Sequence, residues 1–152
     1  MRMNEIDRKI LAELQNNGRL SVTDLGNKVG LSLSPCHRRV RALEDGGVIT
    51  GYRAVLSPAA VGLNFSAIVF VTLQETGREY VQAFEDALLD VPEITTAQRL
   101  FGDPDYILNL LTCDIDAFRQ LYDRTLSSLP GVARLKSTLV MKDIVRERPI
   151  AL

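Results

Sequence analysis

Histidine and cysteine are scarce in this sequence: among its 152 residues there is one histidine, His37, and there are two cysteines, Cys36 and Cys113. The cysteines lie far apart and lack neighbouring ligand residues, so neither a disulfide framework nor a zinc site is expected. No apolar run reaches the length of about 18 residues that a membrane-spanning helix needs. The first residues, MRMNEIDRKIL, carry acidic side chains early and do not resemble a secretory signal. These absences predict a protein of the reducing cytoplasm that has no contact with a membrane.

The residue combinations of catalytic sites are missing as well. No nucleophile is paired with a base, no loop has the glycine spacing that holds phosphates, and no cluster of metal ligands occurs. The chain is therefore not expected to be an enzyme, and neither a cofactor nor a metal is expected. Cys36 adjoins the only histidine, but it falls on an apolar helix stripe, where a buried structural cysteine is the usual outcome.

Positive charge is concentrated near the N-terminus, although the net charge of the chain is only −1. Residues 1–56 hold nine Lys and Arg against six Asp and Glu, a net charge of +3. Residues 57–152 hold nine against thirteen, a net charge of −4. A basic first third on an acidic remainder indicates two modules, the first with a polyanionic partner. A solvated surface with an ordinary excess of basic residues is the alternative.

The first third of the sequence predicts three helices. Apolar residues recur at helical spacing from Ile6 to Leu14, and Asn16-Asn17-Gly18 ends that pattern. A second helix is expected after Ser21, because Ser21-Val22-Thr23-Asp24 has the form of a capping box with Asp in place of Glu. Gly30 ends this second helix, and the short connection to the next one is typical of a helix-turn-helix motif.

The third helix is predicted to begin at Ser34 as the N-cap, with Pro35 at the first helical position, where its missing N–H costs nothing. Ser32 is an alternative cap. The helix should run to about residue 45. The following residues 48–56 are rich in β-forming side chains and predict a strand or a small wing, which leads into a hinge around residues 57–64.

The remainder of the chain alternates between strand and helix patterns. The expected elements are a strand at 64–74, a helix at 78–89, a strand at 94–101, a turn at 102–105, a strand at 106–113, a helix at 115–129 and a strand at 132–144. The order βαββαβ is that of a ferredoxin-like domain. Because the first of these strands is apolar on both faces, one face is expected to pack on the helices and the other on a second subunit.

The third helix separates its side chains into two faces at 100° per residue. Cys36, Val40 and Leu43 form the apolar stripe. The opposite, exposed surface carries a hydroxyl, an imidazole and two guanidinium groups, supplied by Ser34, His37, Arg38 and Arg41. Arg39 lies nearer the edge of the core, where it is expected to meet a phosphate or an acidic neighbour.

Such a face has the chemistry of a DNA recognition helix. A helix fits the major groove, its early residues reach base edges, and arginine pairs with guanine through two hydrogen bonds. Serine hydroxyls and a helix N-terminus hold phosphate. The alternative is a solvated basic face on an ordinary helical domain.

An ordered set of segments that spans nearly the whole chain resembles the Lrp/AsnC (feast/famine, leucine-responsive regulatory protein) family of transcription regulators. These segments are IDRKILAELQ (6–15), GRLS (18–21), LSLSPCHRRVRALE (31–44), GVITGY (47–52), GDPDY (102–106) and LPGV (129–132). The resemblance implies an α+β fold, with an N-terminal three-helix (winged) helix-turn-helix domain followed by a C-terminal βαββαβ ferredoxin-like domain. The expected bounds are 1–50 for the helix-turn-helix domain, 51–63 for a β linker or hinge, and 64–152 for the ferredoxin-like domain.

The resemblance also implies partners for each domain. The first is expected to bind double-stranded DNA, and the second is expected to bind a small effector, an amino acid, and to join homodimers into a higher oligomer such as an octamer. The residues expected at the DNA are Ser21, Ser32, Ser34, Pro35, His37, Arg38, Arg39 and Arg41. Alternatives are an amino-acid-sensing module that does not bind DNA and an architectural DNA-binding protein without ligand control.

In this family the effector site lies near the turn between the second and third strands, at an interface between subunits. The corresponding candidates here are Leu100, Phe101, Gly102, Asp103, Pro104, Asp105 and Tyr106, with Ser137 from the last strand. A carboxylate can hold an ammonium group, and Asp105 is the first candidate for this role and Asp103 the second. Backbone N–H groups near Gly102 can hold an α-carboxylate. Leu135 and Val145 replace the Thr and Lys that relatives often carry, which leaves the identity of the effector open. From the turn alone, an ordinary hairpin is the alternative.

Overall fold

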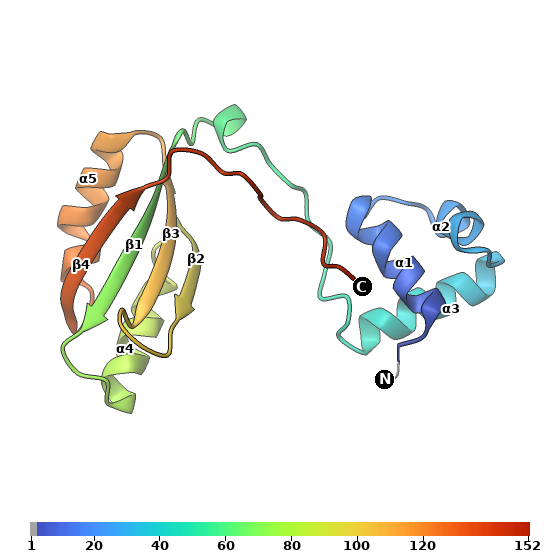
Figure 1. Cartoon of the computed structure of the whole chain (residues 1–152), viewed down its shortest axis with the longest axis horizontal. Coiled ribbons are helices and arrows are strands. Elements are labelled where there is room, and N and C mark those ends of the chain that lie inside the picture. Colours follow the sequence, from blue (N-terminus) through green and yellow to red (C-terminus); the bar gives the residue numbers. More distant parts are fainter. Residues whose placement is uncertain (1–2) are drawn as a thin grey trace. The chain divides into compact units, whose positions relative to one another are not determined.

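A computed structural model describes residues 3–152, which form two compact units (Figure 1). The first unit contains the described residues up to Val55 together with Ile144–Leu152, and the second contains Leu56–Asp143. The chain therefore passes between the units twice. The sequence-based boundary, which assigned 64–152 to one domain, differs from this division, because the last nine residues pack with the N-terminal unit. No helix within residues 3–152 is long and apolar enough to cross a membrane.

The first unit is built on three helices, α1 (Glu5–Asn16), α2 (Val22–Val29) and α3 (Leu33–Asp45). The three-helix prediction is confirmed. The helices enclose a small apolar core made of Ile10, Leu11, Leu25, Cys36, Val40 and Leu43. Each helix buries only one stripe, so its opposite side remains available to solvent.

The turn between α2 and α3 depends on two glycines. Gly30 ends α2 in the left-handed conformation, with φ 75°, which side chains other than glycine rarely adopt. Gly26 is buried, and a Cβ atom there would lie 2.7 Å from the carbonyl oxygen of Leu31. The backbone of the turn therefore passes too close to α2 for any side chain at residue 26.

The predicted start of α3 is wrong, and the alternative cap is the observed one. Ser32 occupies the N-cap position and Leu33 is the first helical residue, so Pro35 lies at the third position of the first turn. Proline is tolerated there because the first N–H groups of a helix have no partner within the helix.

The strand or wing expected at residues 48–56 is also absent from the described part of the first unit. The N–H groups of Val48 and Ile49 instead donate to the carbonyl oxygen of Leu43, at 2.9 and 3.1 Å. These residues close the C-terminal end of α3, and no neighbouring strand offers them a ladder. Their high β-propensity therefore has no sheet to join.

The second unit has the predicted order βαββαβ: β1 (Phe65–Leu73), α4 (Arg78–Leu88), β2 (Ile94–Arg99), β3 (Tyr106–Thr112), α5 (Ile115–Arg124) and β4 (Val132–Leu139). Two short 3₁₀ helices, η1 (Ala59–Val61) and η2 (Leu126–Ser128), precede β1 and β4. The four strands form one antiparallel sheet with the order β2-β3-β1-β4. The last strand ends at Leu139 and not at residue 144, because its ladder with β1 ends at the pair of Ala67 and Leu139.

The two faces of the sheet differ in how they are covered. Figure 1 shows α4 and α5 on one face, and the alternate residues of β1 that point to them are buried: Ala67, Val69, Val71 and Leu73. The side chains between them, such as Ile68 and Phe70, are only half-buried, and those of β3 alternate in the same way. No described segment of this unit covers that second face, so an apolar strip stays partly exposed.

Candidate functional site

The exposed side of α3 carries the polar and basic groups that the helical wheel predicts there. Cys36 and Leu43 are fully buried and Val40 is nearly so. The side chains expected on the opposite face, Ser34, His37, Arg38 and Arg41, are all exposed. Leu33, at the first helical position, is 56% exposed, although it is apolar. The first two turns of α3 therefore present hydroxyl, apolar, imidazole and guanidinium groups together, which suits the edges of bases in a groove.

Arg39 has a partner within the unit. Its guanidinium Nη1 lies 2.8 Å from Oδ1 of Asp7, and the Asp7 side chain is only 3% exposed, against 32% for Arg39. The other oxygen of Asp7 accepts a hydrogen bond from the backbone N–H of Asn4 at 3.1 Å, while the Asn4 side chain accepts from the N–H of Asp7 at 2.9 Å. Of the two neighbours expected for Arg39, the structure shows the acidic one. Arg39 thus ties α3 to the capping box that starts α1.

Ser21 and Ser32 mark the starts of α2 and α3. The Ser21 hydroxyl accepts from the N–H of Asp24 at 3.0 Å and donates to its carboxylate at 2.6 Å, so its side chain is already engaged. Ser32 makes no side-chain bond to its helix. Helix N-termini attract anions through their free N–H groups, and Asp24 counteracts this attraction at α2. The start of α3, which has no acidic residue in its first turn, is the more favourable position for phosphate.

The turn between β2 and β3 is held to the end of β1 by Asp105. Its carboxylate Oδ2 accepts from the N–H of Leu73 at 2.8 Å, and its own N–H donates to the carbonyl of Val71 at 2.9 Å. Its carbonyl oxygen accepts from Leu100 at 2.7 Å. One oxygen of the carboxylate expected to hold an ammonium group is therefore already bonded to the backbone.

The tip of the same turn is open to solvent. Phe101 is fully exposed, and Gly102 is exposed with φ 143°, which permits a backbone shape that side chains disfavour. Oδ1 of Asp103 lies 3.4 Å from Arg134 Nη2 on β4. Asp103 and Pro104 line a hollow of about 540 Å³ whose other walls are Phe70, Thr72, Arg134, Leu135 and Lys136.

Two of the expected effector residues lie elsewhere in the second unit. Tyr106 is buried on the helix side of the sheet, where its ring lies 4.8 Å from that of Phe84 and its hydroxyl donates to Glu85 at 2.8 Å. Burial, and then the neighbouring Glu85 carboxylate, raise the pKa of Tyr106 to about 12. Ser137 lines a different hollow beside α5, with Phe118 and Tyr122 among its neighbours. Within one chain, therefore, neither side chain lines the hollow beside Asp103 and Pro104.

Sequence reasoning missed the two cations of that hollow, Arg134 and Lys136. They alternate along β4 and lie opposite Thr72 and Phe70 of β1 in the ladder. Their spacing of two is the available signal, because it places both side chains on the same face of a strand. The chemistry of the hollow is thus one carboxylate and two cations beside apolar surface. Across the described residues, no group of three or more His, Cys, Asp or Glu could hold a metal ion.

The two units match two family models. A winged helix-turn-helix DNA-binding model covers residues 3–50, and the Lrp/AsnC ligand binding domain model covers residues 66–150. The chain is 40% identical to a proline dehydrogenase transcriptional activator of Rhodobacter capsulatus, over 93% of this chain and 92% of that protein. It is 38% identical to the leucine-responsive regulatory protein of Escherichia coli, over 93% and 87%. The crystal structure of a transcriptional regulator of Neisseria meningitidis in complex with L-Met matches with a TM-score of 0.93 and 35% identity, over 99% of this chain and 97% of that chain.

Fold and surface together define a helix-turn-helix DNA-binding protein that carries a ligand-binding domain. The two models account for most of the chain, and the curated relatives match over nearly its whole length. The chain belongs to the Lrp/AsnC family of transcription regulators, so the family expected from the sequence is confirmed, as is the fold. DNA is the partner of the first unit.

Proposed function

We propose that α3 is the helix that reads DNA, with Ser34, His37, Arg38 and Arg41 at base edges or phosphates. The observation that carries this proposal is the exposed basic face opposite the buried stripe of α3. Arginine contributes bidentate contacts to guanine, and the bare N-terminus of α3 adds a phosphate site beside Ser32. Pro35 shapes the first turn. Ser21 contacts phosphate at the start of α2 only if its hydroxyl turns away from Asp24, to which it is bonded here, whereas Arg39 supports α3 through Asp7.

A salt series of DNA affinities tests this assignment. Replacing both Arg38 and Arg41 by Ala should weaken binding to the operator and reduce the slope of log K against log salt by about 0.9 for each lost phosphate contact. Arg119→Ala is the matched control, because Arg119 is an exposed arginine on α5 of the other unit. Unchanged affinity of the double variant, measured by fluorescence anisotropy, would show that α3 does not read DNA.

We propose that the effector is an amino acid and that it binds at the turn formed by residues 100–106. The support is the ligand-binding family model over residues 66–150 and the L-Met complex of the relative from Neisseria meningitidis. The hollow beside Asp103 adds a carboxylate for an ammonium group and cations for a carboxylate. Phe101, which is fully exposed here, is the wall that a second subunit would cover. Ser137 joins the site only if an assembled neighbour brings it there.

We further propose that homodimers form over the uncovered face of the sheet and join into octamers. We also propose that the protein acts in the cytoplasm, in keeping with DNA as the partner of its first unit. The half-buried side chains of β1 and β3 on that face, Ile68 and Phe70 among them, support a protein partner. Light scattering coupled to size exclusion measures the assembly, with and without each amino acid. A thermal-shift screen of the twenty amino acids identifies the effector, since a ligand raises stability according to its concentration relative to Kd. A monomer in solution would refute the assembly, and no shift at millimolar amino acid would refute the effector class.

A further inference from the structure

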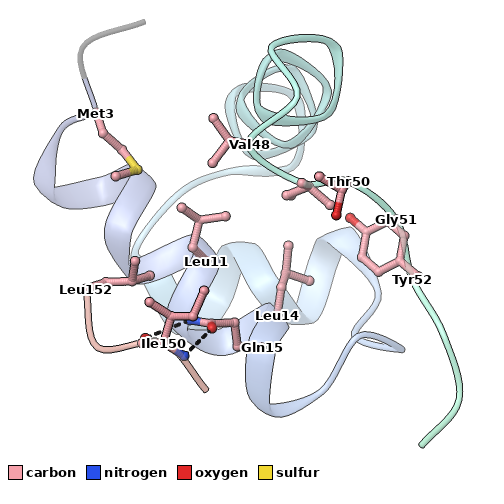
Figure 2. A pocket seen from close by; sticks show the side chains of 11 residues that line it. Met3, Leu11, Leu14, Gln15, Val48, Thr50, Gly51, Tyr52, Ile150 and Leu152 are labelled. Atoms are coloured by element: carbon pink, nitrogen blue, oxygen red, sulfur yellow. Dashed lines mark hydrogen bonds between the residues drawn. The ribbon is translucent and has the colours of Figure 1, made fainter. Parts of the chain in front are cut away.

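Residues 144–152, called here the return segment, come back to the first unit and contact the end of α1. The Gln15 side chain bonds to both backbone groups of Ile150, although the two residues are 135 positions apart. Its Nε2 donates to the Ile150 carbonyl at 3.1 Å, and the Ile150 N–H donates to its Oε1 at 2.6 Å. Figure 2 shows this pair of bonds. A side-chain amide here replaces the neighbouring strand that an extended segment would otherwise need.

A second contact fixes the return segment at its bend. The carboxylate of Glu147 lies 2.9 Å from Nη2 of Arg53. Arg53 belongs to the same unit and lies close to the point where the chain first leaves it. Glu147 has φ 46°, and among residues 3–152 no other residue apart from glycine has a positive φ. Such a backbone conformation is unfavourable for a side chain like glutamate and persists where surrounding contacts hold it. The ion pair is the contact that Glu147 makes there, and it is exposed, with the Arg53 side chain 78% and the Glu147 side chain 43% accessible.

An apolar groove receives the end of the return segment. The groove has a volume of about 320 Å³ and is lined by Leu11, Leu14 and residues 48–52, with Ile150 and Leu152 at its rim (Figure 2). The side chains of Ile150 and Leu152 both line this groove. Even so, Ile150 remains 74% exposed and Leu152 45% exposed. The contact is therefore shallow, as expected of a segment that can detach.

We propose that the return segment is a detachable strap on the DNA-binding unit and forms its second connection to the sheet domain. The chain leaves the DNA-binding unit after Val55 and returns to it at Ile144. The strap lines the same groove as Val48 and Ile49, whose N–H groups close the end of α3 on Leu43. The segment that occupies the groove is the protein's own, because the backbone bonds, the ion pair and the apolar rim all come from one chain. A strap in this place supports the same helix that carries the basic face.

A regulatory consequence rests on the proposed function. If an effector changes the sheet domain, a strap anchored directly after that domain carries the change to the end of α3. A variant without the strap should still bind DNA through the basic face. However, the ratio of its DNA affinities with and without effector should move toward one.

Hydrogen exchange, compared between the full chain and its variants, tests the strap directly. A variant that stops after residue 143 and the point variant Ile150→Asp should both exchange the amides of Val48 and Ile49 about 5- to 30-fold faster. Amides of β1 and β3 should exchange at unchanged rates. Gln15→Ala should have a smaller effect in the same place, and Gln120→Ala, an exposed glutamine on α5, should have none. Unchanged exchange at residues 48–49 in both strap variants would overturn the proposal, and so would a change confined to the sheet domain.

Swapping the two charged side chains of the ion pair provides a second test that involves no deletion. Arg53→Glu should accelerate exchange at residues 48–49, and adding Glu147→Arg should restore the original rate. Failure of this rescue would remove the ion pair from the strap. DNA affinities are then measured with and without the amino acid found by the thermal-shift screen. If the amino acid changes DNA affinity by the same factor in the proteins with and without the strap, the regulatory step alone is overturned. The hydrogen-exchange data test the strap even if no amino acid binds.

Discussion

Replacing either of two neighbouring arginines on α3 by alanine is expected to have different effects: one replacement should lower stability and the other should weaken DNA binding. Arg38 is exposed, whereas Arg39 is bonded to the buried carboxylate of Asp7 at 2.8 Å. Arg39→Ala leaves that carboxylate without its cation in a place where water reaches it poorly. Arg38→Ala removes a group that faces solvent and should change the free energy of unfolding by no more than about 0.5 kcal/mol.

The size of the Arg39 effect follows from the burial of the two partners. Breaking a fully buried ion pair costs about 3–5 kcal/mol, while an exposed pair contributes about 0–1 kcal/mol. Asp7 is 3% exposed but Arg39 is 32% exposed, so solvent screens one side of the pair. The expected loss lies between these limits, at about 1–3 kcal/mol. The Asn4–Asp7 capping box remains in this variant and holds α1 in place.

Urea unfolding followed by circular dichroism, with hydrogen exchange of α1 and α3 as the local readout, measures this loss. A double-mutant cycle with Asp7→Asn should give a coupling energy of about 0.5–3 kcal/mol. DNA affinity supplies the opposite pattern: Arg38→Ala should weaken binding at temperatures where both variants are folded, and Arg39→Ala should weaken it far less. Equal stability of the Arg39→Ala variant and the parent protein would refute the reasoning.

Further predictions concern a tight turn and a buried phenol. Gly26→Ala should destabilise the first unit by about 1–3 kcal/mol in urea unfolding, because the new Cβ would lie 2.7 Å from the Leu31 carbonyl, whereas Gly18→Ala, whose Cβ meets its nearest neighbour at 3.4 Å, should have little effect. The pKa of Tyr106 is raised from its ordinary value of 10.0 to about 12, first by burial and then by Glu85. Since the folded state holds this proton more tightly, Tyr106 contributes stability below pH 10 that is lost as the pH rises from about 10 to about 12. An alkaline absorbance titration should lose its last tyrosine component in Tyr106→Phe, and persistence of that component would contradict the assignment.

Local patterns were sufficient to predict the helices and strands, because each element buries one face and repeats its apolar residues with that period. The stripe of Cys36, Val40 and Leu43 is an example, and the alternation along β1 is another. The same reasoning failed at residues 48–56, where β-forming residues meet no partner strand within the described first unit. A strand depends on a neighbour, and the identity of that neighbour is not a local property of the sequence.

The long-range contacts of the candidate sites could not be predicted for the same reason. The wheel placed Arg39 at the edge of the core but did not identify Asp7, which lies 32 positions earlier. Nothing in the sequence near Gln15 indicates that its amide bonds to Ile150. Arg134 and Lys136 were overlooked in the effector region, because a turn motif identifies only its own residues and not those that the sheet brings beside it.

The two acidic residues of the turn are expected to have separate roles. Asp105 accepts the N–H of Leu73, so Asp105→Ala leaves a partly buried donor without its partner and should cost about 1–3 kcal/mol in the absence of ligand. The pair of Asp103 and Arg134 is exposed, with side chains 76% and 66% accessible, so Asp103→Ala should change stability by less than about 1 kcal/mol. If Asp103 holds the ammonium group of the effector, this variant should lose the thermal shift produced by the amino acid while its melting temperature without ligand stays unchanged. A retained shift in Asp103→Ala, together with a lost shift in a still-folded Asp105→Asn variant, would instead assign the ammonium contact to Asp105.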